Sequence, residues 1–418
     1  MQAMPASSAN QMRVRFPDGE AQAMIRVAFL VHSLQAGGIE RSITRIVNGL
    51  DTTKFEPTII CLDRSGPAAN WLTRAVPIVE IGKRPGTDPL AIGRLAHVLR
   101  ERRIDLVQSH NWGTLIECVL ARKLAGTRFH VHAERGTVLG MVNPQGLRHT
   151  LRAAAMKRAL RTVDRVISNA EAVAQRVQAR CGYPAQFITI IPNGVPKTTD
   201  ELREADRDAI RRRLGVAEHE IVIGSVGRLA PVKGFDLALR AFEKLQQRHS
   251  PVHFLLVGDG PEADALTELT SALGLAGKVH LVGRQERAEV WLSAMDIYVN
   301  SSHSEGMSQS IIEAMAAGLP IVATDVGDSA VLITKAELPC GVICPPSEVD
   351  SLAECFDRLV SDMSARRELA QNAIRCHASF YSEEVLIASI QTLYDEVLSR
   401  AKRTGQAPHP VGPQRMTT

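Results

Sequence analysis

The chain has 418 residues, of which 45% are hydrophobic and 22% charged, and its formal net charge is +4. This length exceeds the usual size of a single hydrophobic core, so two domains are expected. The small net charge and the 4% content of aromatic residues argue against a nucleic-acid-binding protein, which needs a basic surface and platforms for base stacking.

The N-terminal segment and the cysteines indicate the compartment. Residues 1–22 contain prolines, serines and arginines but no apolar core of the kind found in signal peptides, so we expect a disordered leader. The sequence contains no run of 18 apolar residues, so we expect no membrane-spanning helix. The seven cysteines are odd in number and scattered, which favours a reducing compartment, by default the cytoplasm. Cys340 and Cys344 lack a second pair with metal-ligand spacing, so we expect buried thiols and no metal site.

The first half of the chain alternates short apolar, β-branched runs with amphipathic segments. The predicted strands are 25–30, 57–62, 77–81, 105–109, 129–133, 165–168 and 187–191. Helical spacing of apolar residues follows in segments such as 90–103, 115–124 and 147–162. This alternation predicts an α/β domain with a parallel sheet and helices on both faces.

A polar stretch from Pro196 to about Asp206 interrupts this pattern, and we place a domain boundary there. The pattern then restarts with predicted strands 221–226, 252–257, 279–282, 297–300 and 320–323, and with predicted helices 235–247, 262–273, 288–295 and 308–317. The expected domains are therefore 23–200 and 201–380, followed by a helix at 381–402 that packs back on the first domain and a loose tail at 403–418. In two such doubly wound sheets, ligands bind beyond the carboxyl ends of the strands, so a cleft between the domains is the expected site.

Residues 301–320 carry the strongest chemical signal. They run from a strand end through a glycine-containing loop into a helix, with Ser308 at the expected N-cap and Gly318 beyond the expected helix end. Backbone N–H groups at such a helix start favour an anion. Glu305 precedes the helix and Glu313 lies inside it, where carboxylates could accept hydrogen bonds from hydroxyls. The combination suits a nucleotide sugar, although each glutamate alone could equally be an exposed residue or a helix former.

This segment resembles the Glu-seven residues-Glu signature of the retaining family 4 glycosyltransferases, in its Glu-Gly and Glu-Ala-Met-Ala-x-Gly-x-Pro context. The resemblance extends over about residues 25–398 and implies the GT-B fold, in which two Rossmann-like domains face each other across a cleft. It implies that residues 23–200 bind the acceptor and 201–380 the nucleotide sugar. It further implies that Glu305 contacts the donor sugar and Glu313 the ribose. Loop residues would contact donor sugar and phosphate, namely Gly306, Met307, Ser308 and Gln309.

A second signal follows the first strand of the second half, where Arg228 and Lys233 stand in a Gly-Arg-Leu…Lys-Gly element. An arginine offers a planar fork of donors and a lysine a mobile point charge, both suited to a diphosphate. By themselves they could be two solvated cations in a turn. The element resembles one in the same family whose cations neutralise the departing diphosphate. The later Val257-Gly258-Asp259-Gly260 turn lacks a third glycine and follows the second strand of its half, so we interpret it as structural rather than dinucleotide-binding.

A third signal is the Gly37-Gly38 pair after the first predicted strand. Two glycines let the backbone approach a ligand closely, and the next helix begins there. A simple turn between a loop and a helix is the alternative. The pair is similar to the Gly-Gly-x-Glu loop of the family, which lies near donor phosphate and acceptor.

Two further candidates follow strands of the first half. His110 closes the strand 105–109 and is expected at the rim of the cleft, although a lone histidine is more often structural. Many relatives have a histidine that contacts the donor sugar after the next strand. Arg135 occupies that position here, with His132 three residues earlier. This departure leaves the sugar-contacting group open, and Arg135 could instead contact an acidic acceptor or the phosphate of a lipid carrier.

A basic stripe interleaved with apolar residues runs through Arg148, Arg152, Lys157, Arg158, Arg161 and Arg165. A solvated helix face is the simpler interpretation. The alternative is a surface that contacts anionic lipid, which would suit a peripheral enzyme at the inner face of the membrane.

The sequence thus predicts a retaining glycosyltransferase that moves a sugar from a nucleoside diphosphate sugar to a hydroxyl acceptor, in cell-surface polysaccharide or lipopolysaccharide synthesis. Its catalytic residues are expected to be Glu305, Arg228, Lys233, His110 and Arg135. No cofactor is expected beyond the donor itself, and the partners are a glycan or lipid-linked acceptor rather than a nucleic acid. Two alternatives stay open: a nucleotide-sugar 2-epimerase of the same architecture, and a non-catalytic nucleotide-sugar-binding subunit.

Overall fold

The computed structural model describes residues 24–86, 88–135, 147–197, 200–249 and 251–404. The predicted leader and nearly all of the predicted tail lie outside these residues. The described residues form two compact units. Of the described residues, the first unit contains those up to 132 together with 162–164 and Thr404, and the second unit contains 133–161 together with 165–403.

Seven strands form the first sheet, in the order β3-β2-β1-β4-β5-β6-β7. They are β1 (Ile25–Val31), β2 (Phe55–Cys61), β3 (Ile78–Glu80), β4 (Leu106–His110), β5 (Phe129–Glu134), β6 (Arg165–Ser168) and β7 (Ile188–Ile190). The helices between them are α1 (Gly38–Gly49), α2 (Pro89–Glu101), α3 (Trp112–Ala125), α4 (Leu147–Leu160) and α5 (Glu171–Cys181). Strand β1 pairs in parallel with both β2 and β4, so the strand order reverses direction between β1 and β4.

Six strands form the second sheet, in the order β10-β9-β8-β11-β12-β13, and the pairings recorded are parallel. They are β8 (Ile221–Val226), β9 (Val252–Val257), β10 (Val279–Leu281), β11 (Ile297–Asn300), β12 (Ile321–Thr324) and β13 (Gly341–Cys344). The helices of this part are α6 (Asp200–Leu214), α7 (Phe235–Gln246), α8 (Ala263–Ala272), α9 (Gln309–Ala316), α10 (Ser329–Ile333), α11 (Val349–Ser361), α12 (Met363–Cys376) and α13 (Glu383–Thr404).

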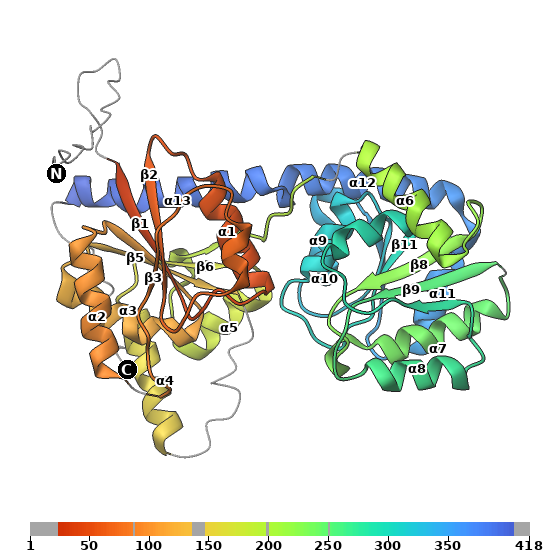
Figure 1. The fold of residues 1–418 in the computed structure, drawn as a ribbon, viewed down its shortest axis with the longest axis horizontal. Coiled ribbons are helices and arrows are strands. Elements are labelled where there is room, and N and C mark those ends of the chain that lie inside the picture. Colours follow the sequence, from red (N-terminus) through yellow and green to blue (C-terminus); the bar gives the residue numbers. More distant parts are fainter. Residues whose placement is uncertain (1–23, 87, 136–146, 198–199, 250, 405–418) are drawn as a thin grey trace, which may run out of the picture. The chain divides into compact units, whose positions relative to one another are not determined.

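The second sheet is buried on both faces, which explains its continuous apolar strands. Successive residues of a strand point to opposite faces. Val222 accordingly packs in the cluster formed with α9, α10 and α12, whereas its neighbour Ile223 packs in the cluster formed with α7, α8 and α11. Helices α7 and α8 lie on one side of this sheet, and α9 and α10 on the other (Figure 1). Each large side chain buried in this way contributes about 1.5–3 kcal/mol to folding.

The predicted strands are confirmed, and the structure adds detail at three places. The polar stretch in which we placed the domain boundary contains the start of α6 at Asp200, a helix that was not predicted. The helix predicted at 288–295 is a 3₁₀ helix, Ala288–Ala294. Strand β13 was not predicted, because it is a four-residue edge strand whose first three residues are only partly buried, which weakens its apolar pattern.

The remaining expectations concern cysteines and the membrane. All seven cysteines are free thiols, and Cys340 and Cys344 are buried as predicted. Across the ranges that the structure describes, no helix combines the length and apolarity needed to cross a bilayer.

Candidate active site

The second sheet has its topological switch point between β8 and β11, because the chain continues from β8 toward β9 on one side and from β11 toward β12 on the other. In open parallel sheets, ligands bind beyond the carboxyl ends of the two strands that flank such a point. The loop 227–234 follows β8 and the loop 301–308 follows β11. These two loops carry the candidate residues Arg228, Lys233 and Glu305. The positions of these side chains therefore define the candidate site.

Lys233 and Glu305 meet at this switch point. The Nζ of Lys233 donates to Oε1 of Glu305 at 2.5 Å, and the hydroxyl of Ser302 donates to the same oxygen at 2.9 Å. Both side chains of the ion pair are largely covered, with 25% of Lys233 and 13% of Glu305 exposed. Limited access to water strengthens such a charge-assisted pair. The structure thus brings together a predicted cation and a predicted carboxylate that stand 72 residues apart.

Gly234 allows the backbones of the two loops to pack closely against each other. Its φ of +58° lies in the left-handed region, and a Cβ at this position would lie 2.3 Å from the carbonyl oxygen of Ser301. The hydroxyl of Ser301 donates to the carbonyl oxygen of Lys233 at 3.0 Å, and the amide of His303 donates to that of Val232 at 2.8 Å. Only glycine combines this conformation with so close an approach, which gives the Lys-Gly sequence a physical reason.

Helix α9 begins directly after the second loop. Ser308 occupies the N-cap position as predicted, but its side chain does not cap the helix. Its hydroxyl instead accepts a hydrogen bond from Nδ2 of Asn300 at 2.7 Å and lies 3.2 Å from the hydroxyl of Ser310. The N-cap side chain therefore leaves the first-turn N–H groups to other acceptors. At the other end, Gly318 has a φ of +64°, as expected beyond a helix C-terminus.

Glu313 lies half-buried inside α9, where Nε2 of Gln309 approaches its Oε1 at 3.5 Å. Its carboxylate lies close enough to Tyr298, a buried residue of β11, to influence the pKa of that phenol. Burial, with a smaller contribution from the Glu313 carboxylate, raises the pKa of Tyr298 to about 12. The phenol therefore stays neutral and donates toward the carbonyl oxygen of Val226 at 3.4 Å.

Arg228 lies exposed in the loop after β8, and its guanidinium makes no hydrogen bond or ion pair with the residues that the structure describes. The turn after β9 supports its backbone. The amide of Leu229 donates to the carbonyl oxygen of Asp259 at 3.0 Å. Gly258 has a φ of +147°, and a Cβ there would lie 1.8 Å from the carbonyl oxygen of Gly227. The turn that faintly resembled a dinucleotide motif is thus a structural support for the Arg228 loop.

The candidates of the first unit lie at its own strand reversal, between β1 and β4. Helix α1 begins at Gly38 after an extended Gly37. A Cβ on Gly37 would lie 2.6 Å from Oε2 of Glu40. His110, the last residue of β4, is only 3% exposed, and its ring stacks on Phe29 with centroids 6.2 Å apart. The histidine that we expected at a rim therefore has a buried side chain.

A buried polar cluster beside His110 was missed by the sequence analysis. The hydroxyl of Ser109 lies 2.7 Å from Nε2 of His130 and 2.8 Å from Nδ1 of His132. The thiol of Cys118 lies 3.3 Å from the same His130 nitrogen. Burial, followed by the charge of Arg122, lowers the pKa of His130 well below its usual value, so this ring is neutral. The available signal was the spacing of His130 and His132, which places both on one face of a strand.

Arg135 is buried, with 8% of its surface exposed. Its Nη1 donates to Oδ1 of Asn193 at 2.7 Å, and Tyr394 of α13 lies close enough to influence its charge. Burial lowers the pKa of Arg135 to about 10, so the guanidinium remains charged at neutral pH. Its predicted contact with sugar or acceptor stays a prediction, and the structure adds an internal role in which Arg135 joins β5 to Asn193.

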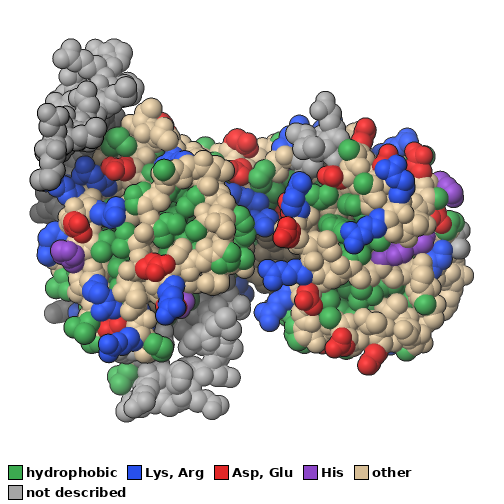
Figure 2. All heavy atoms as spheres, viewed as in Figure 1, with side chains coloured by type: hydrophobic (Ala, Val, Ile, Leu, Met, Phe, Trp, Pro, Cys, Tyr) green, Lys and Arg blue, Asp and Glu red, His purple; other side chains and the backbone are tan. Residues whose placement is uncertain are grey.

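The basic stripe is shorter than predicted. Lys157, Arg158 and Arg161 are exposed at the end of α4, while the side chains of Arg148 and Arg152 lie outside the described part. Arg165 was assigned wrongly to this surface. It is 5% exposed in β6, and its guanidinium lies over the ring of Phe187 at 5.1 Å. Elsewhere on the face in Figure 2, basic and acidic side chains are interspersed, in keeping with the small net charge.

Comparison with known proteins identifies the family. A family described as Glycosyltransferase Family 4 matches residues 36–198, and one described as Glycosyl transferases group 1 matches residues 206–375. The chain belongs to the family 4 glycosyltransferases.

Individual relatives of this glycosyltransferase differ in length. An exopolysaccharide phosphotransferase of Streptomyces coelicolor is 30% identical over 240 residues, which make up 57% of this chain and 24% of the relative. A D-inositol 3-phosphate glycosyltransferase of Rhodococcus opacus is 32% identical over 231 residues, which make up 53% of this chain and 50% of the relative. The chain therefore spans about a quarter of the length of the phosphotransferase and about half the length of the D-inositol 3-phosphate glycosyltransferase.

Solved structures show the same fold. Anabaena HepE in complex with UDP matches with a TM-score of 0.75 at 21% identity, over 90% of this chain and 100% of that chain. HepE has also been solved with UDP-glucose. The predicted GT-B architecture of two Rossmann-like sheets is confirmed.

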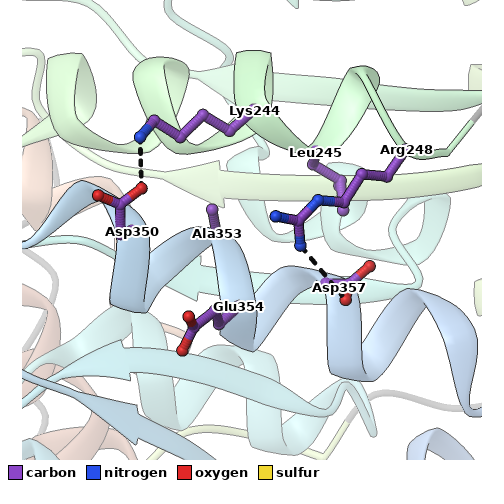
Figure 3. A pocket seen from close by; sticks show the side chains of 7 residues that line it. All are labelled: Lys244, Leu245, Arg248, Asp350, Ala353, Glu354 and Asp357. Carbon is purple, nitrogen blue, oxygen red and sulfur yellow. Dashed lines mark hydrogen bonds and ion pairs between the residues drawn. The ribbon is translucent and has the colours of Figure 1, made fainter.

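Two hollows in the glycosyltransferase lie away from the switch-point loops. One, of about 100 Å³, lies between α7 and α11, where Lys244 pairs with Asp350 and Arg248 with Asp357 (Figure 3). The other, of about 490 Å³, includes Asp296 and Pro320, which precede β11 and β12. The first is a crevice crossed by these two ion pairs, and the second lies at the amino ends of the strands. Neither contains a predicted site residue.

Proposed function

We propose that this glycosyltransferase moves a sugar from a nucleoside diphosphate sugar to a hydroxyl acceptor with retention of configuration. The observation that carries the proposal is the partly covered Lys233–Glu305 pair at the switch point of the second sheet. In this proposal Lys233 supplies a cation for phosphate and Glu305 a carboxylate for sugar hydroxyls, at the strand ends beyond which ligands bind in such sheets.

The protein's share of catalysis is positional and electrostatic. Lys233, Arg228 and the start of α9 stabilise the diphosphate as it leaves, because cations and free backbone N–H groups stabilise negative charge that develops in the transition state. Glu305 and the backbone of Gly306–Gln309 orient the donor sugar, and Glu313 holds the ribose. The acceptor hydroxyl attacks from the face that the diphosphate leaves, and the diphosphate takes its proton, so no covalent enzyme nucleophile is required.

The donor is proposed to be a UDP-sugar, since HepE, which shares the fold, has been solved with UDP and with UDP-glucose. In this proposal two cations of the chain, Arg228 and Lys233, balance the charge of the diphosphate without a divalent metal ion. Gly37 and Gly38 are proposed to approach donor phosphate and acceptor. His110 and Arg135 keep their proposed roles near the reacting sugar.

The first experiment is thermal-shift binding of the purified chain against UDP, GDP, ADP and their common sugar conjugates. A ligand that binds only the folded state raises its apparent stability. One nucleotide family is expected to raise the melting temperature, and UDP is the expected one. If the folded protein responds to none of them, the proposed transfer from a nucleotide sugar of these classes fails.

The ribose assignment predicts that Glu313→Ala weakens donor binding. Loss of a carboxylate that accepts hydrogen bonds from two hydroxyls is expected to raise the donor KM by about tenfold or more, with a smaller effect on kcat. Initial rates at varied donor and acceptor concentrations measure this. An increase confined to the acceptor KM would contradict the assignment.

The reaction products distinguish the proposed transferase from the two alternatives, a 2-epimerase and a non-catalytic subunit. A 2-epimerase would interconvert the donor alone and would need further acid and base carboxylates, whereas a transferase forms product only with an added acceptor. Chromatography of UDP-sugar incubated with the purified chain, with and without candidate acceptors, distinguishes them. Transfer or donor hydrolysis by the chain alone also excludes a non-catalytic subunit.

The acceptor is proposed to be a glycan or a lipid-linked glycan of a cell-surface polysaccharide or lipopolysaccharide, assembled in the cytoplasm at the inner face of the membrane. The name of the Streptomyces relative supports a polysaccharide, and seven free cysteines support a reducing compartment.

Helix α4 supplies the proposed contact with anionic lipid. The helix carries the exposed residues Lys157, Arg158 and Leu151, the last of which is 62% exposed, and exposed Arg161 directly follows it. Replacement of the three cations by glutamate is expected to abolish sedimentation with phosphatidylglycerol vesicles. Phosphatidylcholine vesicles serve as the control, and unchanged sedimentation of the variant would refute the lipid contact.

A further inference from the structure

The start of helix α5 is capped by a residue from a distant part of the chain. The carboxylate of Asp328 accepts hydrogen bonds from the amides of Glu171 at 2.7 Å and Ala172 at 3.0 Å. These are the first two residues of α5, and the N-cap residue Ala170 contributes no side-chain bond. A buried carboxylate at a helix start is favoured by the free N–H groups and by the helix dipole. Asp328, which is 4% exposed, therefore fixes the position of this helix.

The same turn holds the loop that contains Glu305. The amide of Asp328 donates to the carbonyl oxygen of Gly306 at 3.0 Å. Gly327 has a φ of +57°, and a Cβ there would lie 2.5 Å from the carbonyl oxygen of Glu305. Residues 327 and 328 thus bind α5 on one side and the backbone of Glu305 and Gly306 on the other.

One consequence is the position of Arg176, on the second turn of α5. Its Nη2 lies 3.7 Å from the point that a Cβ of Gly306 would occupy. The Nε and Nη2 atoms of Arg176 are buried and have no hydrogen-bond partner among the residues that the structure describes. Burying donors of a charged group without partners is costly, so these atoms indicate a ligand.

We infer that Arg176 binds an oxyanion of the reacting substrates, beside Gly306 and apart from the donor diphosphate. The inference rests on the proposed function, in which Gly306 contacts the donor sugar and the diphosphate is held by Arg228, Lys233 and the start of α9. A guanidinium with two free donors on one edge matches a carboxylate or a phosphate with two parallel hydrogen bonds. The oxyanion comes either from an acidic donor sugar or from an acidic acceptor, and Arg176 makes the enzyme select for it.

The experiment compares the full-length wild type with Arg176→Gln and Arg176→Lys, and uses Arg240→Gln, an exposed arginine of α7, as the matched control. Calorimetric titrations with UDP, UDP-glucose and UDP-glucuronate test the donor. Titration of the UDP-bound protein with inorganic phosphate tests the acceptor side. Melting temperatures of all variants establish that they are folded.

With an acidic donor, Arg176→Gln is expected to weaken binding of UDP-glucuronate relative to UDP-glucose by about tenfold or more, whereas Arg176→Lys retains part of the preference. With an acidic acceptor, phosphate binding by the UDP-bound protein is lost in Arg176→Gln instead. Unchanged binding in both titrations overturns the inference. Weaker binding of UDP itself also overturns it, because Arg176 would then belong to the diphosphate cations. A wild type that binds none of the nucleotides would instead refute the proposed function.

Discussion

Lys233→Ala is expected to lower kcat/KM for sugar transfer by at least about a hundredfold, the scale of losing one group that stabilises developing charge. The Nζ of Lys233 lies 2.5 Å from Glu305, in a position where 25% of its side chain is exposed. Removal of this cation leaves Arg228 as the remaining side-chain cation of the two loops that we assign to the diphosphate. Because the leaving group gains charge in the transition state, the loss should fall mainly on kcat. Steady-state kinetics at varied donor concentration measure kcat and kcat/KM separately.

The same substitution should lower the free energy of unfolding by about 1–3 kcal/mol, because it leaves the largely covered carboxylate of Glu305 without its cation. Lys244→Ala is the matched control, since Lys244 pairs with Asp350 on α7 and α11, away from the switch point. We expect this control to retain full activity. A Lys233→Ala enzyme with a rate within about threefold of wild type would refute the leaving-group role.

Gly258→Ala is expected to destabilise the fold by about 3 kcal/mol or more and to impair donor binding. The φ of Gly258 is +147°, and the added Cβ would lie 1.8 Å from the carbonyl oxygen of Gly227. Neither the conformation nor the backbone contact can be relieved by moving a flexible side chain. The turn after β9 must therefore shift, together with the loop that carries Arg228. Urea unfolding and nucleotide titration measure the two effects.

Gly274→Ala separates conformation from contact. Gly274 also has a positive φ, +69°, but a Cβ there meets no atom within 4 Å. Its substitution should cost only about 1 kcal/mol and leave nucleotide binding unchanged. Equal losses of stability in the two variants would show that the contact with Gly227 is unimportant.

The parts of the fold that could be predicted are those with a strong local pattern. Continuous apolar strands such as Val252–Val257 are buried on both faces, and their composition alone indicates a parallel sheet. Helix α6 was not predicted because most of its residues are charged or polar. Strand β13 was not predicted because a short edge strand needs few apolar residues.

The candidate site, like the fold, could be predicted from the sequence only where a local motif marks it. The loops of Lys233 and Glu305 could be located from the sequence, because both follow strands and carry family motifs. The role of the Ser308 hydroxyl could not, since whether it caps α9 or binds Asn300 depends on how the loop 301–308 folds back on the end of β11. The same holds for Asp328 and Arg176, whose partners lie on segments far away along the chain.

The cap on α5 also bears on the synthesis of the protein. Glu171 and its partner Asp328 are separated by 157 residues. At translation rates of about 5–20 residues per second, the start of α5 waits about 8–30 s before its carboxylate has even been synthesised. Until then the first amides of this helix must bind water or another acceptor. The start of α5 is therefore capped only after β8–β12 of the second sheet have been translated.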